Sequence, residues 1–374
     1  MSSSPRRPAV VRRAPGKLFV AGEYAVVDSG NPAILVAVDR YVTVTVSGSH
    51  TPGVVISSDL ATHPVRRRWH EGRLTADGAQ GGGRPRGGPV HVLSAVETVA
   101  GLLAERGLPV PELELSVVST LHEDGRKFGL GSSGAVTVAS VAAVAAYCGL
   151  ELSRADVYRL ALLATARIDP KGSGGDLAAS TWGGWLLYSA PDRGFVLDLA
   201  RERGIEAALR APWPGFAVRP LPSPAGLSLQ VGWTGNPAST ASLVSDLHRR
   251  TWRGTASHRR FVATTTDVVH AVTGALESGD GPGLLHQIRR ARLELARLDD
   301  EVGLGVFTDE LRALCDAAEG AGGAAKPSGA GGGDCGIALL DAAAPQDISY
   351  VRQRWAAAGV LPLPVRVALE GIQQ

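Results

Sequence analysis

Eight residues decide the fold of this chain: Gly129-Leu130-Gly131-Ser132-Ser133-Gly134-Ala135-Val136. The glycines allow a tight turn and a close approach of the backbone to a ligand. The turn opens into a run of small residues, 137–147, which predicts a helix. The first turn of such a helix presents unpaired N–H groups and the positive end of the helix dipole. The stretch is therefore typical of a phosphate-binding site. A plain strand-to-helix turn, with glycines for packing, is the alternative.

The segments on either side predict a mixed succession of helices and strands. Ser153 is expected to cap a helix that runs to about Ala166, with Asp156 in its first turn. The other helices are expected at 90–106, 258–277, 283–299 and 308–319, and the strands at 10–13, 33–38, 41–46, 113–120, 184–188, 227–233, 337–340 and 365–369. Because strands and helices do not alternate regularly, the pattern favours an α+β fold.

Two stretches are rich in polar, Gly or Pro residues. Residues 47–89 have little apolar patterning and predict a mobile solvent-facing loop; a lid formed by 78–88 is the alternative. Residues 201–224 are rich in Arg and Pro, and we place a domain boundary there. The expected domains are an N-terminal one, 1–210, and a C-terminal one, 211–374.

Composition excludes several classes of protein. The chain has 374 residues, 44% of them hydrophobic and 20% charged, which describes a globular protein. A net charge of +2 gives no electrostatic case for nucleic acid. No uninterrupted run of about 18 apolar residues exists, so no membrane span is expected. Three cysteines that are far apart in sequence indicate a reducing compartment, and we expect the cytoplasm.

Three further polar, glycine-rich segments accompany the opening stretch: 14–24, 171–176 and 326–336. The order, the spacing and the amino-acid sequences of these segments together resemble those of the GHMP kinases, over nearly the whole chain. The first matching motif is Pro15 to Tyr24, the second is Gly129 to Ala135, and the third is Lys326 to Gly336. The resemblance implies a two-domain α+β fold with the active site in the cleft between the domains. No GxxxxGK[ST] sequence occurs, which disfavours a P-loop NTPase.

The resemblance also implies a reaction. The amino-acid sequences of the motifs are most similar to those of family members that transfer the γ-phosphate of ATP to 5-phosphomevalonate, with Mg²⁺ as the metal. Lys17 is implied as the catalytic cation and Asp176 as the catalytic carboxylate. The implied ATP-binding residues are Lys127, Gly129, Leu130, Gly131, Ser132, Ser133, Gly134 and Ala135. The hydroxyls of Ser132 and Ser133 are candidate ligands of Mg²⁺, which prefers oxygen.

Other residues are candidates for binding the acceptor. They are Lys17, Glu23, Tyr24, Lys171, Ser173, Ser239, Thr240, Arg292, Gly331 and Gly332. For Ser239 and Thr240 simple helix capping is an equal alternative, and a solvated helix face explains Arg292 nearly as well. In mevalonate kinases a metal-binding glutamate precedes the catalytic aspartate, and the position that corresponds to it here is Thr165. His63, His91 and His122 have no metal-ligand spacing and are expected to be structural or on the surface.

Two alternatives stay open at this point. One is a mevalonate kinase or another small-molecule kinase of the same family. The other is a GHMP-fold ligand sensor without turnover, against which the intact Lys17, Asp176 and loops argue. In each case the partners are small molecules, and the chain is expected to be a monomer or a homodimer.

Overall fold

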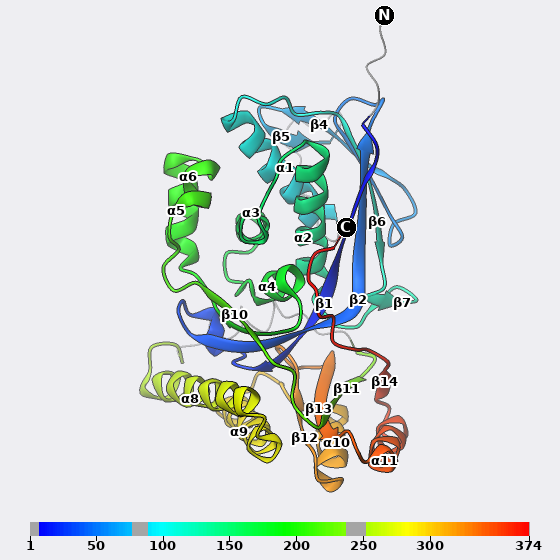
Figure 1. Ribbon diagram of the computed structural model, residues 1–374, viewed down its shortest axis with the longest axis vertical. Coiled ribbons are helices and arrows are strands. Elements are labelled where there is room, and N and C mark those ends of the chain that lie inside the picture. Colours follow the sequence, from blue (N-terminus) through cyan, green and yellow to red (C-terminus); the bar gives the residue numbers. More distant parts are fainter. Residues whose placement is uncertain (1–6, 77–88, 237–251, 374) are drawn as a thin grey trace, which may run out of the picture.

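The computed structural model describes residues 7–76, 89–236 and 252–373. Eight of the described strands form one large sheet around the long strand β2 (Figure 1). β2 (Pro32–Gly48) pairs antiparallel with β1 (Val10–Ala21) along one edge. Its other edge pairs with β9 (Trp185–Ser189) and then with β6 (Leu113–Ser119). Beyond these lie β10 (Ala217–Leu221) on one side and β3 (Val54–Ser58), β4 (Val65–His70) and β5 (Arg73–Thr75) on the other.

Four helices cover one face of this sheet, as Figure 1 shows. They are α1 (Pro89–Glu105), α2 (Ser132–Tyr147), α3 (Arg154–Ala166) and α4 (Gly175–Trp182). α2 packs against β1 and β2 of the sheet and against its neighbours α1, α3 and α4. It is rich in Ala and Val, and small side chains let a helix approach neighbours on several sides at native packing density. The 3-10 turn η1 (Ala25–Val27), the hairpin of β7 (His122–Glu123) and β8 (Arg126–Lys127), and the helices α5 (Arg193–Arg203) and α6 (Ile205–Arg210) complete this half.

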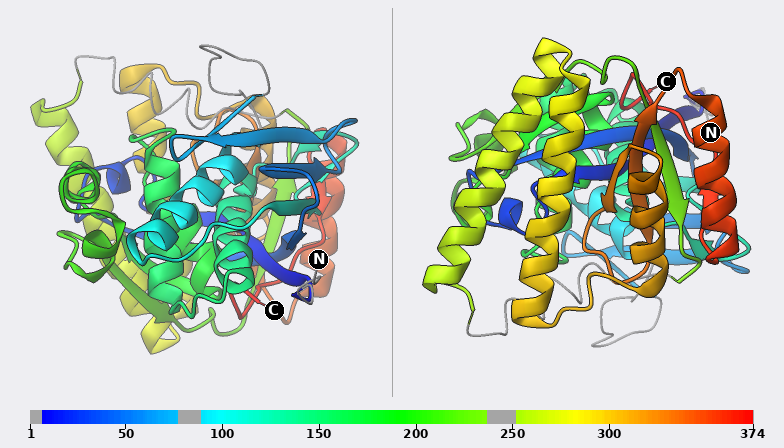
Figure 2. Two further views of the ribbon diagram at one scale, coloured as in Figure 1. Left: turned by 90° about the horizontal axis from the view of Figure 1, so that it is seen from above. Right: turned by 90° about the horizontal axis from the view of Figure 1, so that it is seen from below.

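A second sheet lies below the first. Its strand order is β12 (Ala324–Pro327), β13 (Cys335–Asp341), β11 (Leu227–Trp233) and β14 (Leu361–Leu363). α10 (Asp309–Gly320) and α11 (Pro345–Ala357) pack on it. The long helices α8 (Ala256–Ser278) and α9 (Gly281–Val302) lie side by side, α8 against β2 and α9 against β12 (Figure 2). One buried apolar cluster runs from the first sheet into β11 and β13, so the two sheets share a core.

The last residues of the chain return to the first sheet. Gln373 bridges Arg13 with two backbone hydrogen bonds of 2.9 and 3.1 Å, and Val367 bridges Val38. The backbone of Arg366 also accepts a hydrogen bond from the N–H of Asp39, 2.9 Å. The C-terminal segment therefore contacts the beginning of β1 and, at Val38 and Asp39, the middle of β2.

The structure confirms the expected α+β fold and most of the expected helices. Ser153 caps α3 with a complete capping box to Asp156. Three expectations were wrong. The strand expected at 365–369 does not form, because this segment meets the first sheet only through the isolated bridge of Val367 to Val38, and the last described strand is β14, Leu361–Leu363. The strand at 10–13 does not stop at Pro15, because a register shift between Pro15 and Gly16 lets β1 continue beside β2. Residues 54–75 are not a loop but form β3, β4 and β5, because pairing with β6 stabilises strands whose own apolar pattern is weak.

The domain division at residues 210 and 211 stays a prediction. β10 follows that point and still pairs with β9 of the first sheet, whereas β11 belongs to the second sheet. Within the described ranges, no helix combines the length and apolarity that crossing a membrane requires. The segment 78–88 lies outside the described residues.

Candidate active site

The glycine turn before α2 takes the conformation that its sequence requires. Gly129 and Gly131 have φ of +78° and +76°, in the left-handed region. A Cβ on Gly129 would lie 2.5 Å from Cγ of Asp334. Gly131 is the N-cap of α2, and in the described structure no side chain caps this helix start. The first turn, which begins at Ser132, therefore presents its N–H groups at the positive end of the helix dipole.

Lys17 and Asp176 lie on either side of this turn. Lys17 is on β1, where its backbone N–H donates to the carbonyl of Leu130, 2.8 Å. A Cβ on Gly131 would lie 3.0 Å from Cε of Lys17 and 3.5 Å from Cβ of Asp176. A Cβ on Gly134 would lie 2.5 Å from Oδ2 of Asp176. The fold thus brings the expected cation and carboxylate together against the start of α2.

Both charges are half-buried, and in the described ranges no ion pair joins them. The ammonium of Lys17 lies 5.5 Å from the centre of the Phe19 ring. Asp176 stands in the first turn of α4, which begins after Gly174 in the left-handed region. The two charged groups are therefore held from separate elements and remain available to a ligand at the helix start.

The segment 328–334 closes the site from the second sheet. The Ser328 hydroxyl accepts a hydrogen bond from the N–H of Phe19, 2.8 Å, and donates to its carbonyl, 3.0 Å. The Tyr24 hydroxyl donates to the carbonyl of Ala330, 2.5 Å. A Cβ on Gly329 would lie 4.0 Å from Nζ of Lys17. These contacts hold the segment 328–334 against the end of β1.

Two expected acceptor ligands in this segment have backbone contacts of their own. Gly332 donates its N–H to the carbonyl of Val306, 2.9 Å, and a Cβ on Gly331 would lie 2.5 Å from the same oxygen. Both positions are therefore closely packed against the residues before α10. Their role in acceptor binding stays a prediction.

Glu23 is engaged by a residue that the sequence analysis did not single out. Its carboxylate forms a buried ion pair with Lys326 of β12, and it also accepts a 3.4 Å hydrogen bond from the N–H of Gly329. Lys326 is 0% exposed and Glu23 is 3% exposed. A lysine inside an apolar strand was the available signal, because lysine is almost never fully buried without a partner. Burial, with the Asp299 and Glu23 carboxylates, holds the pKa of Tyr24 far above its usual range, so its phenol stays protonated.

The serines and lysines of the motifs lie around the turn. Ser132 is half-buried and Ser133 is exposed at the start of α2. Lys127 is exposed on β8. Lys171 is exposed before α4, and the Ser173 hydroxyl accepts a 3.3 Å hydrogen bond from Gly175.

One further expected acceptor ligand, Arg292, is engaged by another helix. Arg292 of α9 forms ion pairs with Asp316 and Glu319 of α10, both 2.8 Å. These contacts account for Arg292 structurally, and its role as a ligand stays a prediction. Ser239 and Thr240 lie outside the described residues.

His91 is a neighbour of the site that its sequence context did not indicate. It lies at the start of α1, with Nδ1 3.5 Å from the hydroxyl of Thr137. Burial lowers the pKa of His91, and the Asp176 carboxylate opposes that shift. His91 is therefore a neutral imidazole close enough to Asp176 to feel its charge.

The oxygen donors at the helix start fit Mg²⁺. This ion keeps several waters and is bound by one or two carboxylates together with substrate phosphates. Asp176 and the hydroxyls of Ser132 and Ser133 offer such a set, and in the described parts of the chain no group of three His, Cys, Asp or Glu competes with it. Thr165 carries no carboxylate, and its buried hydroxyl has no hydrogen-bond partner in the same parts.

Comparisons with known proteins identify a family and several relatives. The model of the GHMP kinases N terminal domain matches residues 92–184, and that of the GHMP kinases C terminal domain matches 275–357. Phosphomevalonate kinase from Streptomyces sp. (strain CL190) is 71% identical, over 97% of this chain and 98% of that protein. Mevalonate kinase from Thermococcus sibiricus is 27% identical over similar shares, 97% and 98%. Among solved structures, the phosphomevalonate kinase of Streptococcus pneumoniae in complex with phosphomevalonate and AMPPNP superimposes with a TM-score of 0.82 at 27% identity, covering 96% of this chain and 100% of that one.

Proposed function

The chain belongs to the GHMP kinase family, and from that premise we propose its reaction: it transfers the γ-phosphoryl group of ATP to (R)-5-phosphomevalonate and releases (R)-5-diphosphomevalonate and ADP. This is a step of the mevalonate pathway of isoprenoid biosynthesis. The observation that carries the proposal is the 71% identity to a phosphomevalonate kinase over nearly the full length of both chains. Similarity to a mevalonate kinase is far lower, 27%.

Phosphoryl transfer depends on positioning and on neutralising charge. The N–H groups of the turn 129–135 bind the ATP phosphates, with Lys127 at the edge of the site. Lys17 neutralises charge on the transferred group, and its position beside Gly131 supports this role. When bound, Mg²⁺ offsets charge on the ATP phosphates, and Ser132, Ser133 and Asp176 are the residues that would hold it.

The acceptor is itself an anion. A phosphate monoester has a second pKa of about 6 and is mostly a dianion at pH 7. A general base is therefore unnecessary for most of the acceptor, and the difficulty is to bring two polyanions together. Asp176 orients Lys17 and the acceptor, and it acts as a base only for the monoanion.

The acceptor's own groups are bound by residues around the segment 328–334 and α4. The ligands that we propose are Lys17, Glu23, Tyr24, Lys171, Ser173, Ser239, Thr240, Arg292, Gly331 and Gly332. Glu23 and Tyr24 act on the acceptor through the segment 328–334: Glu23 accepts a hydrogen bond from the N–H of Gly329, and Tyr24 donates one to the carbonyl of Ala330.

Further properties complete the proposal. The active site lies in a cleft between two domains that divide at residues 210 and 211. The three cysteines are free thiols, which supports a reducing compartment, the cytoplasm. The protein acts as a monomer or a homodimer on small molecules.

The experiment that tests the reaction is an ADP-release assay with mevalonate and with 5-phosphomevalonate, repeated with Lys17→Ala. We expect turnover of 5-phosphomevalonate alone, and its loss in the variant. Turnover of mevalonate alone would refute the proposal, and ATP binding without any ADP release would indicate a sensor.

The role of Asp176 needs a separate measurement. Asp176→Asn is expected to lose less rate at pH 8.5 than at pH 6, because at the higher pH the acceptor has already lost its second proton. A loss of rate that is independent of pH contradicts this role.

A further inference from the structure

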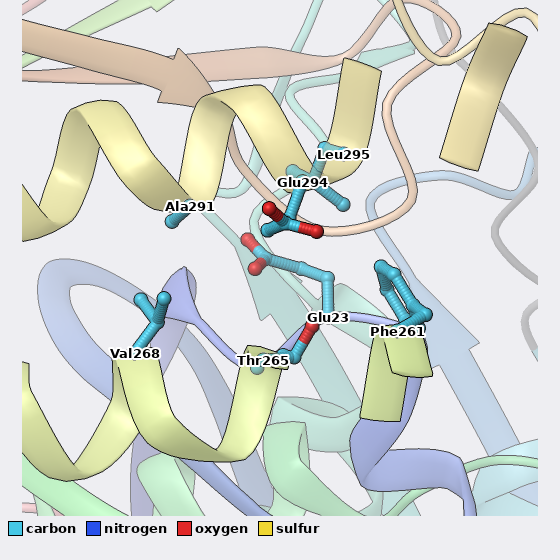
Figure 3. Close-up of a pocket in the computed structure, with 8 residues that line it drawn as sticks. Glu23, Phe261, Thr265, Val268, Ala291, Glu294 and Leu295 are labelled. Carbon is cyan, nitrogen blue, oxygen red and sulfur yellow. The ribbon is translucent and has the colours of Figure 1, made fainter. Parts of the chain in front are cut away.

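A small cavity lies behind the end of β1, between α8 and α9 (Figure 3). Its polar wall consists of Glu23, Thr265 and Glu294, and the rest is mainly apolar, with Phe261, Val268 and Leu295 among the lining residues. The space open to a water-sized particle is about 10 Å³. Such a space holds about one water or one small ion.

The polar side chains of the cavity converge. Figure 3 shows the carboxylates of Glu23 and Glu294 pointing toward one another, with Thr265 close to Glu23. Glu23 and Thr265 are 3% and 7% exposed, and the side chain of Glu294 is 14% exposed. The hydroxyl oxygen of Thr265 has no hydrogen-bond partner among the described residues. Because buried polar atoms are nearly always hydrogen-bonded or bound to an ion or water, this hydroxyl indicates an occupant.

The charges around the cavity indicate whether its occupant is an anion or a cation. Glu23 is paired with Lys326 on one side, and Glu294 is paired with Arg297, whose side chain is 69% exposed and therefore well screened by water. Two facing carboxylates repel an anion, so neither ATP nor a phosphorylated acceptor fits here.

We propose that this cavity is a binding site for a monovalent cation, K⁺ or Na⁺, with Glu23, Glu294 and the Thr265 hydroxyl as ligands. These are hard oxygen donors, which suit an alkali cation and not a thiophilic metal. Mg²⁺ usually keeps several waters, for which the cavity has no room. In the described ranges no three His, Cys, Asp or Glu side chains are grouped around a metal position, so the cavity offers two carboxylates and one hydroxyl.

The cation acts on the active site through Glu23. It offsets the repulsion between the two carboxylates and fixes the side chain that binds Lys326 and the N–H of Gly329. Gly329 lies beside the ammonium of Lys17, so occupancy of the cavity stabilises the segment 328–334 where it closes the site. The binding site follows from the cavity alone, and only its effect on rate rests on the proposed function.

The first test measures occupancy directly. Crystals of the full chain are soaked in Tl⁺, a heavy substitute for K⁺, and the anomalous difference map is examined between Glu23 and Glu294. A peak there supports the proposal, and its absence from crystals of Glu294→Gln confirms the ligand. A map without a peak in the wild-type chain overturns the proposal and assigns the cavity to water. Because the wild-type chain decides the matter, a variant that fails to fold does not spoil the test.

The second test measures whether binding of the cation stabilises the folded chain, at constant ionic strength. Thermal unfolding is compared in KCl, NaCl and tetramethylammonium chloride, whose cation is too large for the cavity. We expect Tm to be about 2 °C higher in KCl or NaCl for the wild type and for Thr265→Ser. The difference should vanish in Thr265→Val and Glu294→Gln but persist in Glu301→Gln, a control in the same helix. Equal Tm in all three salts overturns the proposal. If the Tl⁺ peak is present while 5-phosphomevalonate is not a substrate, the cation site stands and the proposed function fails.

Discussion

Gly134→Ala separates the stability of α2 from the geometry of the site. Gly134 lies in the first turn of α2, and alanine there should favour the helix by about 1 kcal/mol. The new Cβ, however, would lie 2.5 Å from Oδ2, 2.7 Å from Cγ and 2.9 Å from Cβ of Asp176. Since ordinary contacts begin near 3.4 Å, the carboxylate must move by about 0.9 Å. The close contact of Cβ means that rotation of the carboxylate alone does not relieve the clash.

A shift of about 1 Å in a catalytic group lowers the rate by about 100-fold, which corresponds to about 2.7 kcal/mol of activation free energy. We therefore expect kcat for ADP release to fall by about two orders of magnitude in Gly134→Ala. The midpoint of urea unfolding should change little, because the gain in helix propensity opposes the clash.

The matched control is Gly274→Ala, which makes the same change inside α8. A Cβ there meets nothing within 4 Å. This variant should gain up to about 1 kcal/mol of stability and keep full activity. If Gly134→Ala kept a wild-type kcat while folding normally, the proximity of Asp176 to Gly134 would have no catalytic meaning, and the role proposed for Asp176 would be wrong.

Three further predictions concern buried ionisable groups. Lys326→Met leaves the Glu23 carboxylate buried without its partner, so the free energy of unfolding in urea should fall by about 3–5 kcal/mol. The double variant Lys326→Met with Glu23→Gln should recover most of this loss. A double variant that is as unstable as Lys326→Met contradicts the prediction. Burial raises the pKa of Cys315 to about 12 and the pKa of Cys335 far above its usual range. Iodoacetamide at pH 8 should therefore label both thiols in urea but neither in the native protein, which the intact mass of the protein will show. Burial lowers the pKa of His91 below 6.5, so the unfolded chain binds the proton more readily than the folded one. The free energy of unfolding should therefore fall as the pH drops below about 6.5. Between pH 7.5 and 5.5, His91→Asn should lose less of this free energy than the wild type, and equal losses would refute the lowered pKa.

Local signals in the sequence predicted much of the fold. The turn at Gly129 and Gly131 needs the conformations that glycine favours, and Ser153 with Asp156 specifies the start of α3, so both were predicted correctly. Strand limits were harder, because they depend on partners that are distant in sequence. β1 passes through Pro15 and Gly16 since β2 pairs with it on both sides of the irregularity.

In the candidate site, too, local motifs were predictable and contacts between distant residues were not. The motifs indicated Lys17 and Asp176, and the structure brings them together across Gly131. The pairing of Glu23 with Lys326 spans 303 positions, and no local pattern reveals which buried charge pairs with which. The proximity of His91 to Asp176 likewise depends on how α1 packs against α2, which no single segment encodes.

The return of the C-terminal segment to β1 has a consequence for biosynthesis. Arg13 and Gln373 are 360 positions apart in the chain, yet their backbones bridge. At a synthesis rate of about 5–20 residues per second, the start of β1 leaves the ribosome about 20–70 s before its partner is made. Until then the N–H and C=O groups of Arg13 that bond to Gln373 are unpaired, although β2, the other partner of the strand, is already made; other chains can pair with such groups. Translation speed and chaperone supply should therefore influence the yield of native protein.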